Sequence, residues 1–325
     1  MLYPLTFHPI FKERVWGGRK LEQLYQKPLP PGAPIGESWE VSDRPDDRSL
    51  IANGPLAGKD LHWLVNRHPS ELLGATPAQA GRFPLLVKIL DAREKLSLQV
   101  HPPAARAAEL GGDPKTEMWY IAEAEPGATL YVGLKRGFTR AEFERRLQAG
   151  TVAECFHQLQ VRAGDAMFLP SGRVHAIGAG LVIFEIQQNS DTTYRVFDWN
   201  RVGLDGRPRP LHVAESLASI DFGDVEPALL PRDGRAPGVV GFQTLVTDPL
   251  FQVQLGRLEA GAALGLPARR MQVLGVLTGR LQVCDPKTTV ALAPGQFCLV
   301  PACLAETTLR AETRATVLLA ACGQA

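Results

Sequence analysis

Two histidines lie in sequence patterns that suit a metal site. Gly164–His175 has the spacing Gly, five residues, Pro, one residue, Gly, two residues, His. This pattern predicts two strands joined by a tight corner, which turns His175 into the space that the strands enclose. Upstream, Gln99 and His101 are two positions apart on a predicted strand and therefore share a face. If these residues converge with Glu117 inside one β-barrel, they make an open metal site with room for water or a substrate.

Each of these residues also has a simpler interpretation. A lone strand histidine is more often a core or surface residue than a ligand. The polar Gln99 beside His101 and the corner before His175 favour the metal site instead. Glu117 alone would be a solvated charge, but it leads into an apolar strand and so belongs at a barrel mouth. Two imidazoles, a carboxylate and an amide oxygen suit zinc, with manganese, iron or cobalt as alternatives.

Two basic residues lie where a site could use their charge. Arg195 is in a polar, strand-like segment, where a guanidinium suits phosphate or an anionic transition state. The alternative for Arg195 is an ion pair with Asp198 or Glu185. Lys88 interrupts an apolar run, so it either extends past an edge to solvent or faces a site. The other histidines have no organised partners and are interpreted as structural or surface residues: His8, His62, His68, His157 and His212.

The composition narrows the class of protein. The chain has 325 residues, 45% hydrophobic and 21% charged, with a net charge of +1. No basic run suggests nucleic acid binding, and no apolar run reaches the length of about 18 residues that spans a bilayer. Without a signal-peptide pattern at its start, the chain is predicted to be cytoplasmic. The five cysteines include no CxxC pair, so we interpret all five as small buried apolar residues and expect no disulfide.

Short β-rich runs separated by Gly, Pro and Asp predict a chain dominated by strands. Examples are residues 84–90, 181–186, 271–277 and 316–320, and helices are expected only at 60–66, 70–73, 139–148 and 211–219. The Pro- and Gly-rich stretch 226–238 is a candidate linker between two halves. The second half repeats the Gly-five-Pro spacing at Gly295–Pro301 but has no histidine, so it is expected to lack a metal site.

Several segments together resemble the type I mannose-6-phosphate isomerase (phosphomannose isomerase) family in its short bacterial form, a branch of the cupins. The matching segments are residues 14–18, 36–42, 96–102, 115–117, 170–176 and 186–195, in the family's order. The resemblance implies two cupin-type jelly-roll β-barrels. The first, at residues 1–225, would be catalytic and carry small helical insertions. The second, at residues 236–325, would be a degenerate cupin-like barrel without a metal site.

The resemblance also implies a function. It implies one zinc ion per chain, bound by Gln99, His101, Glu117 and His175, and an enzyme that interconverts mannose 6-phosphate and fructose 6-phosphate through an enediol. The partner is then a small phosphosugar, with no nucleic acid or membrane, and the protein is expected to be a monomer or homodimer. The implied substrate-binding residues are Ser97, Lys115 and Arg195. The implied catalytic residues are Arg195, Lys115, Glu185 and Lys88.

Some questions stay open at this stage. The proton-transfer base is Glu185, Lys115, Lys88 or a zinc-bound water. Longer family members carry a larger helical domain between Pro102 and Lys115, whereas only twelve residues lie between them here, so the question of what covers the pocket is open. The alternatives to an isomerase are a cupin metal-dependent dioxygenase, whose site usually has three histidines and one glutamate, and a non-catalytic sugar-binding cupin.

Overall fold

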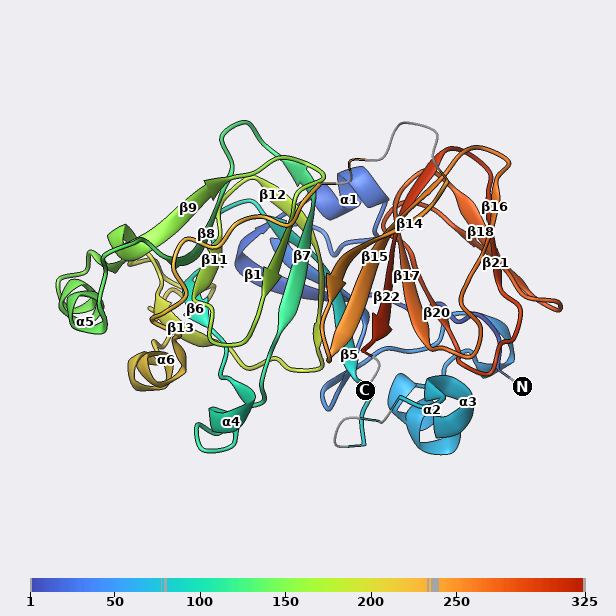
Figure 1. Cartoon of the computed structure of the whole chain (residues 1–325), viewed down its shortest axis with the longest axis horizontal. Helices are drawn as coiled ribbons and strands as arrows, with labels where there is room; N and C mark the ends of the chain where they lie inside the picture. The colour runs from blue at the N-terminus through green and yellow to red at the C-terminus, as the bar shows by residue number, and fades with distance from the viewer. Residues whose placement is uncertain (1, 77, 79–80, 233, 235–239, 324–325) are drawn as a thin grey trace.

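Antiparallel β-sheets form most of the protein. The computed structural model describes residues 2–76, 78, 81–232, 234 and 240–323. Four main sheets lie side by side across the molecule, two from each half of the chain, as Figure 1 shows. All strand pairs in these sheets are antiparallel. The prediction of an all-β-dominated chain is therefore confirmed, and the arrangement is consistent with the jelly-roll type.

The first half of the chain forms two sheets that enclose a common interior. One has the order β1 (Ile10–Gly18), β2 (Ile35–Val41), β5 (Leu85–Ala92), β12 (Leu181–Gln188), β7 (Glu117–Ala124) and β10 (Ala166–Leu169). The other has the order β13 (Tyr194–Phe197), β6 (Leu98–Val100), β11 (His175–Ile177), β8 (Thr129–Leu134) and β9 (Phe156–Gln160). A small ribbon of β3 (Asp43–Arg44) and β4 (Asp47–Arg48) follows β2.

The second half repeats this arrangement. One sheet has the order β14 (Gly241–Thr247), β15 (Phe251–Leu258), β22 (Ala315–Cys322), β17 (Gln272–Thr278) and β20 (Phe297–Val300). The other has the order β16 (Ala263–Gly265), β21 (Thr308–Ala311), β18 (Leu281–Cys284) and β19 (Thr289–Leu292). Strand β10 lies within the Gly-five-Pro segment of the first half, and β20 lies within the repeated segment of the second half. Each of the two is an edge strand of its sheet. The faint sequence repeat thus reflects a repeated topology.

The helices of the described residues are short and occur in the first half. They are α1 (Lys20–Tyr25), α2 (Leu61–Arg67), α3 (Pro69–Leu73), α4 (Ala104–Ala107), α5 (Arg140–Gln148) and α6 (Val213–Ser219), with 3-10 turns at Gly54–Leu56 and Val152–Cys155. The four expected helices are present, and α1 and α4 are additional. Thr139 caps α5, because its side-chain oxygen accepts a hydrogen bond from the Glu142 N–H at 3.3 Å. None of the helices in the described parts of the chain has the length and apolarity needed to cross a membrane.

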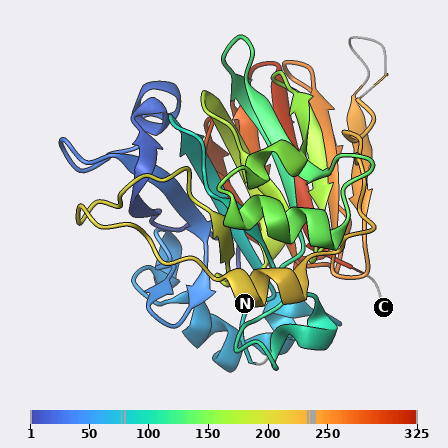
Figure 2. The same ribbon diagram turned by 90° about the vertical axis from the view of Figure 1, so that its left-hand side faces the viewer.

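Strand alternation decides which side chains enter the first barrel. Along β5, Val87 and Ile89 point toward the second half, whereas Leu90 packs in the barrel interior and Lys88 shares its side of the strand. Along β6, Leu98 and Val100 pack outward under helices α5 and α6, which leaves the position between them facing inward. Figure 2 shows these two helices, in green and gold, on the outer side of the smaller sheet.

The two halves share one hydrophobic core. The sheet that contains β5, β12 and β7 faces the sheet that contains β15, β22 and β17, and their side chains belong to a single buried cluster. Phe184 and Phe297 pack across this interface with ring centroids 5.5 Å apart. The N-terminal segment adds to it, because the Leu5 and Leu299 backbones exchange hydrogen bonds of 2.9 and 2.8 Å. Residues from the predicted first domain therefore also pack on the second half.

The predicted boundary near residues 226–235 stays a prediction. Residues 226–232 contact the first half: the Leu230 N–H donates to the Ala166 carbonyl, and Arg232 pairs with Asp165 at 2.6 Å. The rest of the candidate linker includes residues 233 and 235–238, which lie outside the described residues, as does the predicted start of the second domain at residue 236.

Two expectations from the sequence need correction. Cys155, Cys298 and Cys322 are buried, but Cys284 is only half-buried and Cys303 is exposed, because both lie where the outer strands and turns of the second half meet solvent. Three of the histidines that were expected to lack partners have one. The partner is a carboxylate for two of them and a backbone N–H for the third. His62 lies 3.1 Å from Asp43, His68 lies 2.6 Å from Glu71, and His212 accepts from the Arg195 N–H at 3.2 Å.

Candidate active site

Two histidines and one carboxylate meet inside the first barrel. His101 Nε2 lies 3.5 Å from Glu117 Oε2, and His175 Nε2 lies 3.4 Å from Glu117 Oε1. All three side chains are almost completely buried, and their ligand atoms lie within 4.8 Å of one another. They come from three different strand ends: His101 directly follows β6, Glu117 begins β7 and His175 begins β11. The structure thus brings together three of the four predicted ligands.

The outer nitrogens of both imidazoles are fixed by backbone carbonyls. His101 Nδ1 lies 2.8 Å from the Thr192 carbonyl, and His175 Nδ1 lies 2.8 Å from the Arg173 carbonyl. Each Nδ1 therefore carries the proton, and each Nε2 presents its lone pair to the centre of the cluster. His101 Nε2 and Glu117 Oε1 are buried and have no hydrogen-bond partner. Inward lone pairs on buried, unpaired atoms are the arrangement that a metal ion satisfies.

The side chain of Gln99, the fourth predicted ligand, lies beside this cluster. Its amide nitrogen lies 3.3 Å from His175 Nε2, and Ser97 Oγ donates to its amide oxygen at 3.4 Å. Rotation of the amide by half a turn exchanges oxygen and nitrogen at no steric cost, so Gln99 can present an oxygen to the same centre. Its backbone pairs directly with His175 of β11 and Arg195 of β13, which explains why these three side chains are neighbours.

The protein keeps these ligands in their metal-binding protonation states. Burial lowers the pKa of His175 to about 3 and also lowers the pKa of His101, so both imidazoles are neutral near pH 7. Burial alone would raise the pKa of Glu117. The pKa nevertheless lies well below its ordinary value, chiefly because of the adjacent Lys115 ammonium, so the carboxyl is ionised. Neutral imidazole and carboxylate are the forms that coordinate a divalent cation.

The corner before His175 is attached to the other ligand segments. The Gly172 N–H donates to the His101 carbonyl at 2.9 Å, and the Ser171 and Thr116 hydroxyls lie 2.9 Å apart. Gly172 has a φ of 93°, a left-handed conformation that glycine adopts without strain. Arg173 holds the corner from behind through two 2.8 Å hydrogen bonds to the Asp224 carboxylate. The Gly-x5-Pro-x-Gly-x2-His segment therefore positions His175 and also contacts the segments that carry His101 and Glu117.

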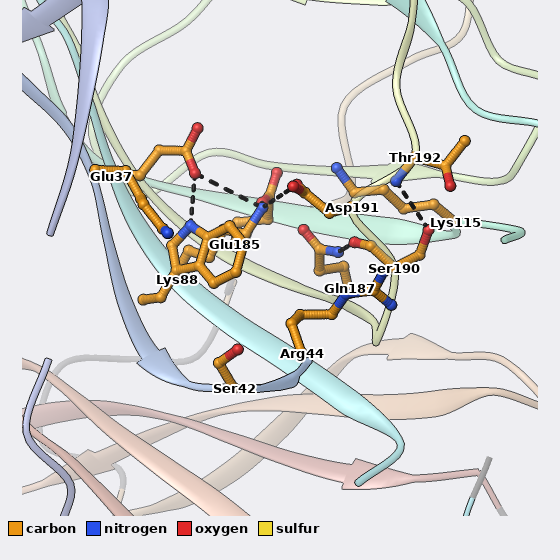
Figure 3. Close-up of polar contacts among 12 residues, drawn as sticks. Glu37, Ser42, Arg44, Lys88, Lys115, Glu185, Gln187, Ser190, Asp191 and Thr192 are labelled. Carbon is orange, nitrogen blue, oxygen red and sulfur yellow. Dashed lines mark hydrogen bonds and ion pairs between the residues drawn. The ribbon is translucent and has the colours of Figure 1, made fainter. Parts of the chain in front are cut away.

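A cavity of about 520 Å³ opens beside the cluster. Its inner wall carries two lysines on opposite sides of Glu185, as Figure 3 shows. Lys115 Nζ lies 2.9 Å from Glu117 Oε2, and Lys88 Nζ lies 3.3 Å from Glu185 Oε2. The remaining lining combines apolar side chains with polar and charged ones, and the latter suit a hydrophilic ligand. It includes Arg14, Glu37, Ser97, Gln99, Asp191, Arg195 and Arg209.

Glu185 is held in an unusual environment for a carboxyl. It is buried on β12, directly opposite Lys88 of β5 and Trp119 of β7, and the Trp119 indole N–H donates to Glu185 Oε1 at 2.9 Å. Burial and the nearby Glu117 carboxylate raise the pKa of Glu185. A carboxyl with a raised pKa inside a cavity is suited to proton transfer.

Arg195 lines the cavity and does not form the alternative ion pair. Its Nη1 donates to the Pro210 carbonyl at 2.7 Å, while its Nε is buried without a partner. Asp198, one of the two expected partners, instead pairs with Arg201 and Arg209 at 2.9 and 2.6 Å. Burial and the neighbouring Arg209 lower the pKa of Arg195. An arginine with an unsatisfied donor beside a polar cavity is suited to an anionic ligand.

The segment between β13 and α6 forms part of the cavity wall. Gly203, Leu204, Asp205 and Arg209 line the cavity, and the Gly203 N–H donates to the Arg207 carbonyl at 2.7 Å to close the loop. Leu204 is exposed. This segment therefore contributes cover to the pocket.

The comparisons with known proteins identify the family of the chain. Residues 5–132 match the family described as phosphomannose isomerase type I, catalytic domain. The chain is 35% identical to a probable mannose-6-phosphate isomerase, GmuF, from Bacillus subtilis, over 95% of this chain and 96% of that protein. It is 34% identical to a mannose-6-phosphate isomerase from Streptococcus mutans, over 93% of each chain. The chain belongs to the type I phosphomannose isomerase family.

A solved structure extends this relationship to the fold. The crystal structure of a mannose 6-phosphate isomerase from Bacillus subtilis superposes with a TM-score of 0.89 at 29% identity, over 98% of this chain and 99% of that one. Membership of the phosphomannose isomerase family thus covers both halves of the chain, including the second half, which carries no histidine.

Several cavity residues were missed by the sequence reasoning. Arg14, Glu37 and Asp191 line the cavity, and the Thr192 carbonyl orients His101. Glu37 lies in a segment that supported the family resemblance, but no role followed from it. The sequence alone carried no signal for it, because the burial that makes Glu37 need a charged partner is visible only in the structure.

Proposed function

We propose that this protein is a zinc-dependent aldose-ketose isomerase that interconverts mannose 6-phosphate and fructose 6-phosphate through an enediol. The observation that carries the proposal is the buried His101–Glu117–His175 cluster beside a cavity lined by Lys88, Glu185 and other charged groups. The relatives at 34–35% identity that bear the name mannose-6-phosphate isomerase support the choice of reaction.

The donor set favours zinc. His101, His175, Glu117 and the Gln99 amide oxygen offer two nitrogens and two oxygens, a set that suits zinc and leaves room for a substrate oxygen. When bound, a zinc ion supplies positive charge that polarises the substrate's oxygens. A dioxygenase of the cupin type usually uses three histidines, and the described cluster contains two.

Glu185 is the best-placed proton-transfer base. The reaction removes the proton from C2 of the aldose, forms an enediol, and returns a proton to C1 of the ketose. Glu185 is buried in the cavity wall, accepts a hydrogen bond from the Trp119 indole N–H, forms an ion pair with Lys88 and has a raised pKa. Lys115 is paired with Glu117, and Glu117 and Glu185 together raise its pKa despite burial, so it is a cation rather than a base.

Basic residues around the cavity hold the anionic parts of the substrate. Lys115 and Lys88 lie on either side of Glu185 and stabilise negative charge that develops on the enediolate oxygens. Arg195, with its unsatisfied Nε, binds the phosphate or the enediolate. Ser97, which lines the same wall beside Gln99, is placed to bind a sugar hydroxyl.

A survey of substrates tests the proposal. The purified, zinc-loaded protein is assayed with hexose and pentose phosphates of both aldose and ketose type. We expect mannose 6-phosphate and fructose 6-phosphate to interconvert with the highest kcat/KM. In deuterated water, we also expect deuterium at the transferred position, and a Glu185→Gln variant that retains zinc should lose this exchange and turnover together. If another phosphosugar had the highest kcat/KM, that sugar would become the assigned substrate. Absence of all isomerase activity would reject the proposal.

A further inference from the structure

Lys88 is surrounded by three carboxylates. Its Nζ lies 3.3 Å from Glu185 Oε2, 3.9 Å from Glu37 Oε2 and 4.0 Å from Asp191 Oδ1, as Figure 3 shows. The ammonium also lies over the Trp39 ring, 4.9 Å from its centroid. Lys88 is buried on a central strand of its sheet. The position of the Lys88 ammonium therefore depends on the relative strength with which Glu185, Glu37 and Asp191 attract it.

The three carboxylates differ in how firmly they are held. Asp191 lies in the segment after β12, and 49% of its side chain is exposed. Glu185 is the proposed base and must change its proton occupancy during the reaction. Glu37 is almost completely buried on β2, and each of its two oxygens accepts a hydrogen bond. The first bond comes from Arg14, whose Nε donates to Oε1 at 2.8 Å.

The second hydrogen bond to Glu37 comes from Trp39. Its indole N–H donates to Oε2, the oxygen nearer Lys88, at 2.6 Å. Trp39 is also paired directly opposite Lys88 in the register of β2 and β5. Burial would raise the pKa of Glu37, but Lys88 and Arg14 lower it more, to about 2. Glu37 is therefore a fixed anion that has no proton to exchange with a substrate.

We propose that Glu37 is a positioning residue that holds the Lys88 ammonium away from full contact with Glu185, with Arg14 and Trp39 fixing Glu37 for that task. The inference rests on the proposed function, because it assumes that Glu185 and Lys88 act on the substrate. Without Glu37, the ammonium forms a closer ion pair with Glu185. A tighter ion pair makes Glu185 a weaker base, because the positive charge stabilises its ionised form.

The predicted signature is a loss in kcat rather than in substrate binding. In the Glu37→Gln variant, we expect kcat to fall about tenfold or more while KM stays within about threefold, because the group lost acts on the transition state and not on ground-state binding. Zinc content should equal that of the parent, because Glu37 contacts no proposed ligand of the metal.

A double-mutant cycle with Lys88 gives the decisive test. If Glu37 acts through Lys88, adding Glu37→Gln to Lys88→Met changes kcat by less than about twofold, although Glu37→Gln alone lowers it about tenfold. Equal losses in both backgrounds would overturn the inference, as would parental kinetics in Glu37→Gln. If the parent itself isomerised no phosphosugar, the proposed function would fail first and this inference with it.

Glu40→Gln is a matched control on the same strand. Glu40 is buried on β2 and paired with Lys27 at 2.6 Å, but it does not line the catalytic cavity. Its loss should reduce stability and leave kcat unchanged. If Glu37→Gln does not fold, Arg14→Gln replaces it, because Arg14 is partly exposed and its removal frees Glu37 without leaving Lys88 unpaired. A smaller loss confined to kcat is expected from Arg14→Gln, and a loss confined to KM would contradict the inference.

Discussion

Lys88 and Glu185 lie directly opposite each other on neighbouring strands, and their charged atoms are 3.3 Å apart inside the cavity. This pair connects the two parts of the account. Strand register places the pair beside the metal-ligand cluster, and burial gives Glu185 the raised pKa that a proton-transfer base needs. The predictions that follow test the ligands, the anion-binding group, the acid stability and the shared core.

The first prediction concerns the metal ligands. His175→Ala removes one of three convergent donors and should lower zinc affinity by at least about 10²-fold, the upper range reported for loss of a group that supports a metal site. Zinc measured after dialysis should be near one per chain in the parent and near zero in the variant. His157→Ala, at a half-buried position of β9 away from the cluster, is the control and should retain zinc. Unchanged zinc in His175→Ala would contradict the ligand assignment.

The second prediction concerns Arg195. Arg195→Lys should retain the fold and the zinc but lower kcat/KM by at least about 10²-fold, because lysine does not reproduce the fixed guanidinium fork. A loss confined to KM assigns Arg195 to phosphate binding, and a loss in kcat assigns it to the transition state. Steady-state kinetics separate the two. Parental kinetics would mean that the contact with the Pro210 carbonyl is its main role.

The third prediction concerns acid stability. The folded state lowers the pKa of Glu37 from 4.5 to about 2, against the effect of burial, because Lys88 and Arg14 favour the carboxylate. Since this pKa is lower in the folded state, the ionised carboxyl stabilises the fold above pH 4.5, and the contribution disappears as the pH falls toward 2. The Glu37→Gln variant lacks this titration.

The difference in free energy of unfolding between the parent and Glu37→Gln should therefore narrow by about 2 kcal/mol between pH 5 and pH 3. Urea unfolding at each pH measures it. A difference that stays constant over this range would show that Glu37 does not have a lowered pKa in the folded protein.

The fourth prediction concerns the core shared by the two halves. Leu299→Ala should lower the free energy of unfolding by about 2–5 kcal/mol, because Leu299 is fully buried between the halves. Both halves should still unfold in one transition, since their large sheets share a hydrophobic cluster. Tryptophan fluorescence, with all five tryptophans in the first half, should coincide with circular dichroism. Two separate transitions would instead support independent domains.

Much of the site could be predicted because strand alternation is local. The two-residue spacing of Gln99 and His101 alone predicts that they share a face of a strand. Pro170 and Gly172 predict the tight turn before His175. The sequence could not show that Lys88 faces Glu185, because their pairing depends on the register of two strands about 100 residues apart. The same holds for the Thr192 carbonyl behind His101, since a backbone acceptor leaves no sequence signal.

The fold class and most of the strands and helices were predicted from the sequence. Contacts between segments that are far apart in the sequence were not. The Gly-x5-Pro repeat indicated a second barrel, but not that the N-terminal segment and α3 would pack on it. Helix α1 was missed because its six residues carry no side-chain cap. Glu37 was missed because a buried carboxylate can be interpreted only when its partners, Arg14 and Lys88, are known in space.

The most direct test of the account is metal-dependent isomerisation. The purified protein is assayed for conversion of mannose 6-phosphate to fructose 6-phosphate as isolated, after removal of metal with EDTA, and after addition of one equivalent of zinc. The account predicts turnover as isolated, loss of activity after EDTA, and recovery with zinc at a stoichiometry of about one per chain. Full activity in the metal-free protein, or no isomerisation in the zinc-loaded protein, would contradict it.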